Sequence, residues 1–298
     1  MPSRRAHESI RSVPFSPGRF ESMSPTTPGI DVALLSDLPK RYGREEFIGP
    51  QRPNFSILLF VTSGQATHTL DFTPYRLEAG DLLWIRSGQV QEWGRLEDLC
   101  GQVISFDSHA LPPDTWPIVD SVRPRSHWPA VLSTNRQVSA AAAFISAVAD
   151  GTIGSATGRA AALAHAIAAL LISLTVADSC HEGEPELPGS ARDFTLFMNT
   201  VETLISAAPG TQTVAHAMGV SPKTLDRLAR AYTGRSAKKN IDDRVILEAK
   251  RLLVHTGAPV ATIGRQLGYP DSGNFSRYFR RITNTTPAQF RYSHQHRT

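Results

Sequence analysis

Apolar residues in the first third of the chain occur in short runs that turn signals separate. The run at 56–61 is apolar apart from Ser56, and residues 65–72 roughly alternate between apolar and polar positions. The pairs Ser63–Gly64 and Pro74–Tyr75 are expected to turn the chain. Strands are predicted at 56–61, 65–72, 75–78, 82–86 and 101–106. Short strands with regular turns predict a small sandwich or barrel.

The pattern becomes helical and rich in alanine between residues 136 and 178. Apolar residues recur there at steps of three and four, which predicts two helices, the second at about 158–177. The stretch 160–177 is barely long enough to span a membrane, and His165 interrupts it. We therefore predict no membrane span, and helices that cover the sheet or pair with a second copy of the chain.

The last third contains one pattern twice. A small residue is followed four positions later by glycine at Ala215–Gly219 and again at Gly264–Gly268. In a helix-turn-helix the small residue lets two helices cross closely, and the glycine takes the positive φ of the tight turn. The two copies predict two helix-turn-helix units, at about 211–232 and 260–283.

A helix is predicted after each of these turns and between the two units. These helices are expected at 222–232, 236–255 and 272–282. Ser221 and Ser236 suit the N-caps of the first two, and Asp271 or Ser272 can cap the third. The middle helix would hold the other two at a fixed separation, which is what successive major grooves about 34 Å apart require.

Charge divides the chain into an acidic and a basic part. The 298 residues carry a formal net charge of +4, which separates into −5 for residues 1–189 and +9 for residues 190–298. A strongly basic segment favours a polyanionic partner such as nucleic acid. Two cysteines are too few for a disulfide scaffold and fit a reducing cytosol. No apolar run of export-signal length follows the arginines near the start.

The basic part resembles the AraC/XylS family of bacterial transcription regulators over about residues 193–294. The motifs that carry the resemblance are Ser221-x-x-x-Leu-x-Arg227, Thr233-Gly234, Arg244-x-x-x-Glu-Ala-Lys-Arg-Leu-Leu253, Ile263-Gly-x-x-x-Gly-Tyr269, Asn274-Phe-Ser-Arg-Tyr-Phe-Arg-Arg281 and Thr286-Pro-Ala-Gln-Phe-Arg291. The chain departs from the family pattern at Ala229, Gly264 and Asn284. We expect the first two departures to loosen packing, whereas Asn284 still tolerates a left-handed φ.

The resemblance implies which residues meet DNA. The positions that the family turns toward the bases are Lys223, Thr224, Asp226, Arg227, Ser272, Gly273, Asn274 and Arg277. Their chemistry suits base edges, because arginine pairs with guanine, asparagine with adenine, and aspartate accepts from cytosine. Phosphate contacts, which set register and affinity, are expected from Arg230, Arg235, Lys238, Arg280 and Arg281.

The first part is similar, more loosely, to the cupin-like sensory domain often fused to this DNA-binding module. The similarity lies in the segment Gly80–Ile85 and the turn Ser87–Gly88. Metal-using cupins hold their metal with a His-x-His pair, a glutamate and a third histidine. Here His68 has no such partner and Gln91 stands at the later histidine position, so no metal and no cofactor are predicted.

A barrel of this size can hold one small molecule. The candidate pocket residues are His68, Trp84, Arg86, Gln91 and Trp93. The alternative is that His68 is an ordinary strand residue and that the two tryptophans are core. No nucleophile elbow, phosphate loop or dinucleotide motif occurs, so no catalytic residue is predicted.

These observations predict an α+β protein, with a small cupin-like β-barrel and flanking helices before an all-α domain of two helix-turn-helix subdomains joined by a connector helix. The predicted boundaries are a disordered tail at 1–28, the barrel at 29–135, a dimerisation or covering region at 136–178, a linker at 179–191 and the DNA-binding domain at 192–298.

The predicted function is a cytoplasmic, sequence-specific DNA-binding transcription regulator that a small-molecule effector controls, and not an enzyme. The expected partners are double-stranded DNA, the effector and a second copy of the chain, with RNA polymerase as a further candidate. Two alternatives stay open: a cupin-type metal enzyme with an appended DNA-binding module, and an architectural DNA-binding protein without an effector.

Overall fold

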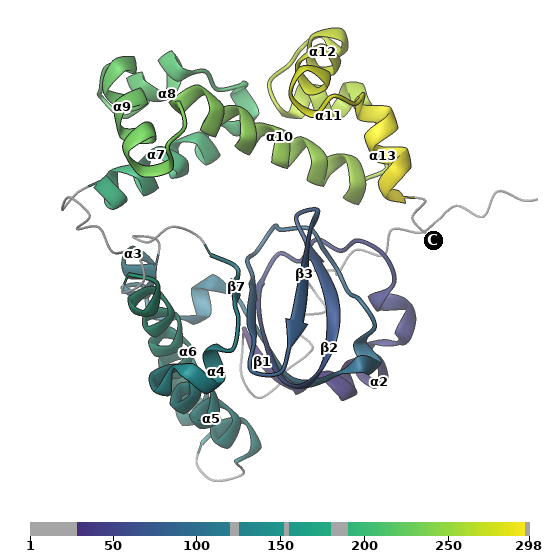
Figure 1. Ribbon diagram of the computed structural model, residues 1–298, viewed down its shortest axis with the longest axis vertical. Helices are drawn as coiled ribbons and strands as arrows, with labels where there is room; N and C mark the ends of the chain where they lie inside the picture. Colours follow the sequence, from purple (N-terminus) through teal and green to yellow (C-terminus); the bar gives the residue numbers. More distant parts are fainter. Residues whose placement is uncertain (1–28, 120–124, 152–154, 180–189, 296–298) are drawn as a thin grey trace, which may run out of the picture.

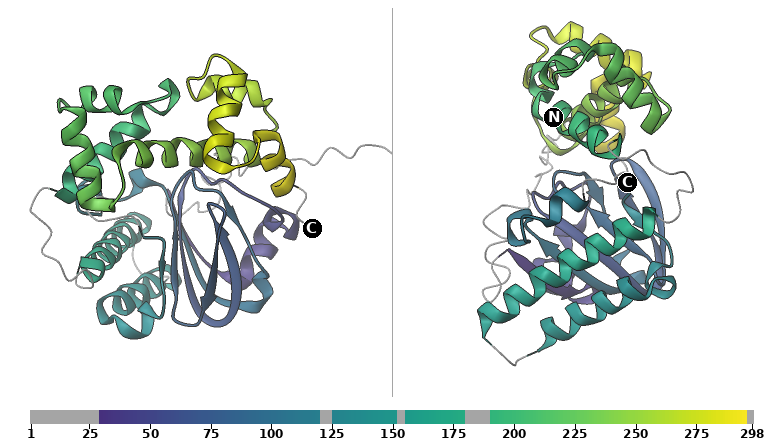
Figure 2. Two further views of the ribbon diagram at one scale, coloured as in Figure 1. Left: turned by 45° about the horizontal axis from the view of Figure 1, so that its top comes forward. Right: turned by 90° about the vertical axis from the view of Figure 1, so that its left-hand side faces the viewer.

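The computed structural model describes residues 29–119, 125–151, 155–179 and 190–295 (Figure 1). A sheet with two long helices forms one end of the molecule, and a group of helices around α10 forms the other end (Figures 1 and 2). The tail predicted at 1–28 and most of the linker predicted at 179–191 lie outside the described residues.

The strands form one antiparallel sheet in the order β1-β6-β2-β4-β7, with β3 and β5 also paired to β2. Their bounds are β1 (Ile30–Leu34), β2 (Ser56–Leu70), β3 (Thr73–Glu78), β4 (Leu82–Ile85), β5 (Gln91–Glu92), β6 (Leu99–Phe106) and β7 (His127–Trp128). The hydrogen-bonded path ends at β1 and β7, so the sheet is open within the described residues. An N-terminal sheet domain is therefore present, but the predicted closure into a barrel is not shown.

The turn predicted at Ser63–Gly64 is not formed. Strand β2 runs through both residues, and its pairing with β6 shifts between Val61 and Ser63. Gly64 has a φ of +87°, and a side chain there would collide with the carbonyl group of Asp98. A glycine inside a strand can form a bulge as well as a turn, and here the neighbouring strand selects the bulge.

The turn predicted at Pro74–Tyr75 lies instead at Asp71–Phe72, between β2 and β3. Pro74 is already inside β3, where it pairs with Thr69. Asp71 and Phe72 have φ values of 46° and 68°. Two-residue hairpin turns with positive φ at both positions usually contain asparagine and glycine, so this turn is strained and depends on contacts that hold it.

The two faces of the sheet are buried in different cores. Leu58 and Trp84 lie on the face that α5 (Arg136–Asp150) and α6 (Ala156–Ser179) cover, which we call the helix-covered face. Leu59, Leu77 and Leu83 lie on the opposite face, here called the inner face. Alternate residues of one strand therefore serve two cores. The shorter helices of this end are α2 (Leu38–Tyr42), α3 (Thr115–Val119) and α4 (Val131–Thr134).

Helix α6 is long and apolar enough to cross a membrane by length and composition alone. Half of its apolar window, within Ala156–Val176, is buried in the protein. Ile167 and Leu171 of this helix are fully buried in the core of the helix-covered face. The helix thus covers the sheet, which is one of the two arrangements that its pattern predicts.

The helical end is organised around α10. Its elements are α7 (Ser190–Thr203), α8 (Thr211–Ala217), α9 (Pro222–Thr233), α10 (Ala237–His255), α11 (Val260–Gln266), α12 (Ser272–Thr283) and α13 (Pro287–Gln295). Ile241 and Val245 of α10 pack in the core of the first helix pair, α8 and α9. Ala249 and Leu253 pack in the core of the second pair, α11 and α12. The predicted connector helix is present and joins the two pairs.

The two pairs repeat each other position by position. Each residue from 221 to 239 has the same exposure class as the residue fifty positions later, from 271 to 289. Leu225 and Phe275, for example, are equivalent and fully buried. The internal repeat that the sequence predicts therefore extends to the burial of every side chain in these stretches.

Candidate nucleic-acid interface and effector site

Helix α9 presents its first turn to solvent. Ser221 caps the helix by accepting a hydrogen bond from the amide of Thr224 at 3.0 Å, as predicted. Lys223, Thr224 and Arg227 are exposed, whereas Leu225 is fully buried. The predicted base-facing side chains thus share one accessible surface, and the apolar side chain between them anchors the helix.

Helix α12 has the same arrangement with different side chains. Asp271 caps it by accepting a hydrogen bond from the amide of Gly273 at 2.9 Å. Ser272, Gly273, Asn274 and Arg277 are exposed. Nη2 of Arg277 donates a hydrogen bond to Oδ1 of Asn274 at 2.6 Å. The two side chains with the strongest base-reading chemistry therefore hold each other in place.

The crossing of α11 and α12 depends on Gly264. A Cβ atom at this position would lie 3.1 Å from Cβ of Phe275. Phe275 therefore packs directly against Gly264, and an alanine at this position would require the ring to shift by a few tenths of an ångström. Gly219 and Gly268 have φ values of 68° and 81°, and Asn284 has a φ of 59°. The left-handed positions predicted for these residues are confirmed.

The carboxylate of Asp226 accepts hydrogen bonds from its own chain. Its Oδ2 accepts a hydrogen bond from Nε of Arg230 at 2.7 Å, and its Oδ1 accepts one from the amide of Ala237 at 2.9 Å. The bond from Arg230, followed by the one from Ala237, lowers the pKa of Asp226 below its usual value. A residue predicted to face the bases thus directs both carboxylate oxygens toward its own chain.

The predicted phosphate contacts fall into two groups. Arg230, Arg235 and Lys238 form ion pairs with aspartates of α9 and α10. Arg281 lies over an aromatic ring of its own helix, with 5.5 Å between its guanidinium carbon and the ring centre. Arg280 is exposed and has no ion-pair partner among the described residues. The basic side chains of α12 are therefore less restrained by acidic neighbours.

The five predicted effector residues lie on two faces of the sheet. His68, Gln91 and Trp93 are buried, and Trp93 belongs to the core of the inner face. Trp84 lies in the core of the helix-covered face, with the guanidinium group of Arg86 at 3.9 Å from its ring centre. Trp84 and Arg86 therefore do not share a site with the other three residues.

A buried polar cluster joins the three inner-face residues to Gln51, which sequence reasoning missed. Oε1 of Gln51 accepts hydrogen bonds from Nε1 of Trp93 at 3.0 Å and Nε2 of Gln91 at 3.4 Å. Among the described residues, Nε2 of His68, Oε1 of Gln91 and, on the other face, Nε1 of Trp84 are buried side-chain atoms without a hydrogen bond of good geometry. Burial lowers the pKa of His68 to about 4, so the ring is neutral at pH 7.

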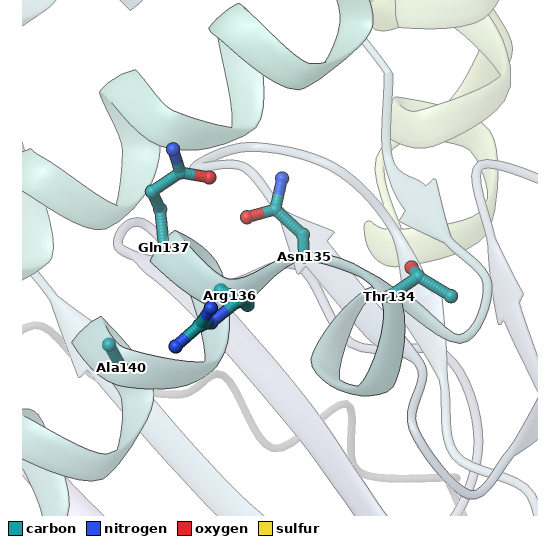
Figure 3. A pocket seen from close by; sticks show the side chains of 5 residues that line it. All are labelled: Thr134, Asn135, Arg136, Gln137 and Ala140. Carbon is teal, nitrogen blue, oxygen red and sulfur yellow. The ribbon is translucent and has the colours of Figure 1, made fainter.

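A large surface hollow lies away from this cluster, and only a small cavity touches it. The hollow, of about 590 Å³, opens where α4 ends and α5 begins, and Arg136 and Gln137 line it (Figure 3). A cavity of about 20 Å³ touches Gln91 and Val254 between the sheet and the helical end, which is room for about one water molecule. Within the described ranges, no three His, Cys, Asp or Glu side chains gather as a metal site.

Two family models match the chain, one at each end of the molecule. The AraC-like ligand binding domain matches residues 39–174, which include β2 to β7 and most of α6. The helix-turn-helix domain matches residues 214–293, which include the second half of α8 and all of α9 to α12. The chain belongs to the AraC family of transcription regulators.

Relatives of this AraC-family protein include named bacterial transcription regulators. The HTH-type transcriptional activator RhaS of Salmonella agona is 22% identical over 248 residues, which are 80% of this chain and 85% of RhaS. The arabinose operon regulatory protein of Escherichia coli is 40% identical over 78 residues, 26% of this chain and 27% of that protein. The solved structure of ToxT from Vibrio cholerae aligns at 11% identity with a TM-score of 0.44, over 89% of this chain and 98% of ToxT.

In this regulator the strained turn Asp71–Phe72 connects the sheet to the helical end. The carboxylate of Asp71 accepts hydrogen bonds from Nε and Nη2 of Arg251, at 2.8 and 2.6 Å. Nη2 of Arg52 donates to Oε1 of Glu248 at 2.7 Å. Together with Phe72, these two ion pairs form what we call the interdomain contact. No sequence signal marks it, because its partners lie nearly 200 residues apart.

Phe72 packs against the helical end and lines a groove there. Its ring centre lies 5.3 Å from the ring centres of both Phe290 and His294 of α13, and Nζ of Lys250 lies 5.8 Å from it. The groove has a volume of about 610 Å³ and is lined by residues of α10, α12 and α13 as well as by Asp71. Aromatic packing and a buried ion pair thus hold the same turn.

The interdomain contact adjoins the buried polar cluster in the chain. Asp71 also accepts a hydrogen bond from the amide of Val90 at 3.1 Å, and Gln91 of the cluster follows directly. On the other side, Gln51 of the cluster precedes Arg52 of the interdomain contact. The same two backbone segments therefore carry residues of both features.

Proposed function

We propose that the two helix pairs are helix-turn-helix units and that α9 and α12 enter successive major grooves of one DNA duplex. The repeat supports this most strongly, because the exposure pattern of residues 221–239 recurs at 271–289 and gives each pair a polar first turn on an amphipathic helix. Helix α10 packs in the cores of both pairs and so sets their separation. A rigid separation suits grooves about 34 Å apart.

Base reading is assigned to the exposed first turns of these helices. Lys223, Thr224 and Arg227 act from α9, and Asn274 and Arg277 act from α12. Arginine and lysine suit guanine, and asparagine suits adenine. The hydrogen bond between Arg277 and Asn274 supports this role, since side chains that are already ordered lose less entropy on binding.

Phosphate binding is assigned to the last turns of α9 and α12 and to the residues that follow. Arg280 and Arg281 are exposed and are not paired with a described carboxylate. Ser272 and Gly273 lack long side chains, which lets the N-terminus of α12 approach the duplex. These contacts set affinity and register and carry no sequence information themselves.

Footprinting of full-length protein tests the DNA-binding proposal. Duplexes are first selected by the protein from a randomised pool, and the tightest are then probed with a hydroxyl-radical footprint. We expect two protected patches about 10 base pairs apart. Scrambling one patch should weaken binding without abolishing it. A single protected patch, or equal affinity for selected and fully scrambled duplexes, would contradict the proposal.

We infer that a small polar molecule controls this regulator by binding against the cluster of Gln51, His68, Gln91 and Trp93. The match to the AraC-like ligand binding domain supports an effector in this part of the chain. Nε2 of His68 and Oε1 of Gln91 support the position, because no described group makes a hydrogen bond of good geometry to either buried atom and a ligand with a donor and an acceptor would satisfy them.

The effector would act on the helical end through the interdomain contact. A ligand at the cluster displaces the segments that carry Gln51 and Gln91, and the same segments hold Arg52 and Asp71 against α10. Such a ligand shifts the balance between docked and undocked helical ends only by its different affinity for the two states. The interdomain contact is thus the proposed element that both sites bias.

A thermal-shift screen of the full chain against metabolites tests the effector proposal. A ligand at 100 times its Kd should stabilise the protein by about 2.7 kcal/mol. Gln91→Leu should abolish the shift, because it removes a polar partner and keeps similar volume. Gln137→Leu, at the hollow beside α5, is the control that should keep it. A shift that survives Gln91→Leu unchanged would place the ligand elsewhere.

Further parts of the proposal concern assembly and setting. We propose that two chains pair through the exposed faces of α5 and α6, where Phe144 and Val176 leave apolar surface in solvent. Sedimentation of the wild type and of Phe144→Glu tests this pairing: the wild type should sediment as a dimer and the variant as a monomer. A wild-type monomer at micromolar concentration would contradict the pairing.

We also propose that the regulator acts in the bacterial cytoplasm and that its DNA-bound form contacts RNA polymerase, because both follow from the regulatory function. The relatives are regulators, which supports a non-enzymatic role, and metal analysis of purified protein tests the cupin-enzyme alternative.

A further inference from the structure

We propose that Asp226 is a positioning residue that restrains Arg230 and fixes the start of α10, and that it thereby weakens the hold of the first helix pair on DNA. The inference rests on the proposed function, because it takes α9 to be a DNA-reading helix. It differs from the base-facing role that the family resemblance implies for this position.

Both oxygens of Asp226 have partners in the chain. Oδ2 accepts from Nε of Arg230, one turn further along α9, at 2.7 Å. Oδ1 accepts from the amide of Ala237 at 2.9 Å, across the turn that joins α9 to α10. The carboxylate is therefore directed along α9 and toward α10, and each of its oxygens already accepts a hydrogen bond within the chain.

The amide of Ala237 needs such an acceptor. Ala237 is the first residue of α10 and is fully buried, and a first-turn amide has no partner within its own helix. The N-cap residue Ser236 serves a different amide, that of Lys239. The charge of Asp226 also lies at the positive end of α10, where an anion is stabilising. The hydrogen bond from Arg230, followed by the one from Ala237, lowers the pKa of Asp226, so the carboxylate stays ionised to a lower pH than an ordinary aspartate.

The second helix pair provides an internal comparison. Fifty residues after Asp226 and Ala237 stand Ser276 and Pro287. Proline has no N–H group, so no acceptor is needed at this point of the second pair. A carboxylate is thus present in the repeat where a buried amide requires one, and absent where none does. The pattern matches a role within the fold.

The consequence falls on the arginine one turn after each position. Arg230 is paired with Asp226 although its side chain is 60% exposed. Its equivalent, Arg280, has no ion-pair partner among the described residues. To reach a phosphate, Arg230 must leave or share a carboxylate whose own charge repels the duplex. The first pair therefore contributes less to phosphate binding than the second, although the two pairs share one fold.

Asp226→Asn in the full chain separates the two roles. Asparagine keeps an acceptor for the amide of Ala237 and loses the charge that restrains Arg230. We expect tighter binding to selected and scrambled duplexes alike, about threefold at low salt, with a salt slope steeper by about 0.9, the value of one added phosphate contact. A base-reading Asp226 predicts a changed preference at one base pair and an unchanged slope, and that result would overturn the inference.

Ser276→Asp makes the reciprocal change in the second pair. The new carboxylate stands one turn before Arg280, in the position that Asp226 has before Arg230. Binding to every duplex should weaken, and the salt slope should flatten by about 0.9. Affinity and slope identical to the wild type would contradict the inference, because the same geometry would then have no effect on DNA.

Asp226→Ala measures the structural part of the role. It removes the charge and the acceptor together, so its Tm should be lower than that of Asp226→Asn. If both variants lose equal stability, the asparagine does not accept the hydrogen bond from the amide of Ala237. The salt slope of DNA binding by Ser276→Asp then decides whether a carboxylate at this position restrains the following arginine. A wild type that binds no duplex would end the proposed function. Normal wild-type binding with unchanged slopes in Asp226→Asn and Ser276→Asp would overturn this inference alone.

Discussion

The two helix pairs share one backbone and one pattern of burial, yet they differ in what their polar side chains contact. Each of the two helices is followed by a left-handed C-cap residue, Gly234 after α9 and Asn284 after α12. The basic residues Arg230, Arg235 and Lys238 of the first pair and the start of α10 are paired with aspartates. The arginines of α12 have no carboxylate partner within the described part of the chain.

The neighbours of the two pairs differ as well. The core of the second pair includes Phe72 of the sheet, whereas the residues packed in the core of the first pair all belong to the helical end. Apolar burial therefore repeats, while charge pairing and docking do not. The comparison teaches that buried positions are sufficient to specify this fold twice, which leaves exposed and interfacial positions free to acquire different tasks.

Equivalent core truncations should break either pair, and the second more severely. Phe275→Ala removes a fully buried ring that packs against Gly264 and should cost about 3–5 kcal/mol, whereas Leu225→Ala should cost about 2–5 kcal/mol. Urea unfolding followed by circular dichroism measures both. Lys223→Ala, at an exposed position, is the control and should stay within about 0.5 kcal/mol. Losses below about 1 kcal/mol in both core variants would mean that the pairs are not packed as described.

Arg251→Ala should separate the second pair from the sheet. The side chains of Arg251 and Asp71 are 9% and 13% exposed, so loss of the arginine leaves a mostly buried carboxylate without its partner. We expect the docking free energy to fall by about 3 kcal/mol and the radius of gyration in small-angle scattering to rise. Arg235→Ala, which removes an exposed ion pair of the first helix pair, should leave the radius unchanged. Identical radii for both variants would show that the interdomain contact does not hold the two ends.

Arg277→Ala should remove base reading from the second pair at one position. The loss on a selected duplex should be about 1–3 kcal/mol, with relaxed preference at a single base pair. Arg227→Ala is the matched change in the first pair, and we expect a smaller loss because no described side chain makes a hydrogen bond to Arg227 like that between Asn274 and Arg277. Titration of selected and single-mismatch duplexes measures both. If either variant bound every duplex more weakly by the same factor, that arginine would contact phosphates and not bases.

The smallest expected effect concerns the salt dependence of binding. Arg280→Ala should flatten the salt slope by about 0.9 and weaken all duplexes alike. Arg230→Ala should flatten it less, because Asp226 already pairs with this arginine. Titrations of one duplex at four salt concentrations give both slopes. Equal flattening in the two variants would remove the proposed difference between the pairs.

Local features of the helical end could be predicted from the sequence. Ser221 and Ser236 cap α9 and α10 as their positions suggest, because a cap needs only its own side chain and the next helical turn. The left-handed positions at Gly219 and Asn284 are equally local. Two amphipathic helices at a spacing of fifty residues are a strong signal for the same reason, since apolar side chains three and four apart define a face without help from the rest of the fold.

The candidate effector site could be predicted only in part. His68, Gln91 and Trp93 come together, but Trp84 and Arg86 lie on the helix-covered face. The alternation of side chains is reliable within one strand, and the turn between β4 and β5 removes that register for the residues beyond it. The turn predicted at Ser63–Gly64 was wrong for a similar reason, because the pairing with β6 determines whether the glycine forms a bulge or a turn.

The sequence by itself determined the caps, the glycine corners, the repeated amphipathic pattern and the basic charge of the last third, and with them the family. Only the tertiary structure decided that Asp226 serves the amide of Ala237 and that Asp71 meets Arg251. The physical reason is range. A cap or a helical face depends on residues within one or two turns, whereas the partner of a charged side chain depends on which distant segment the packing brings beside it.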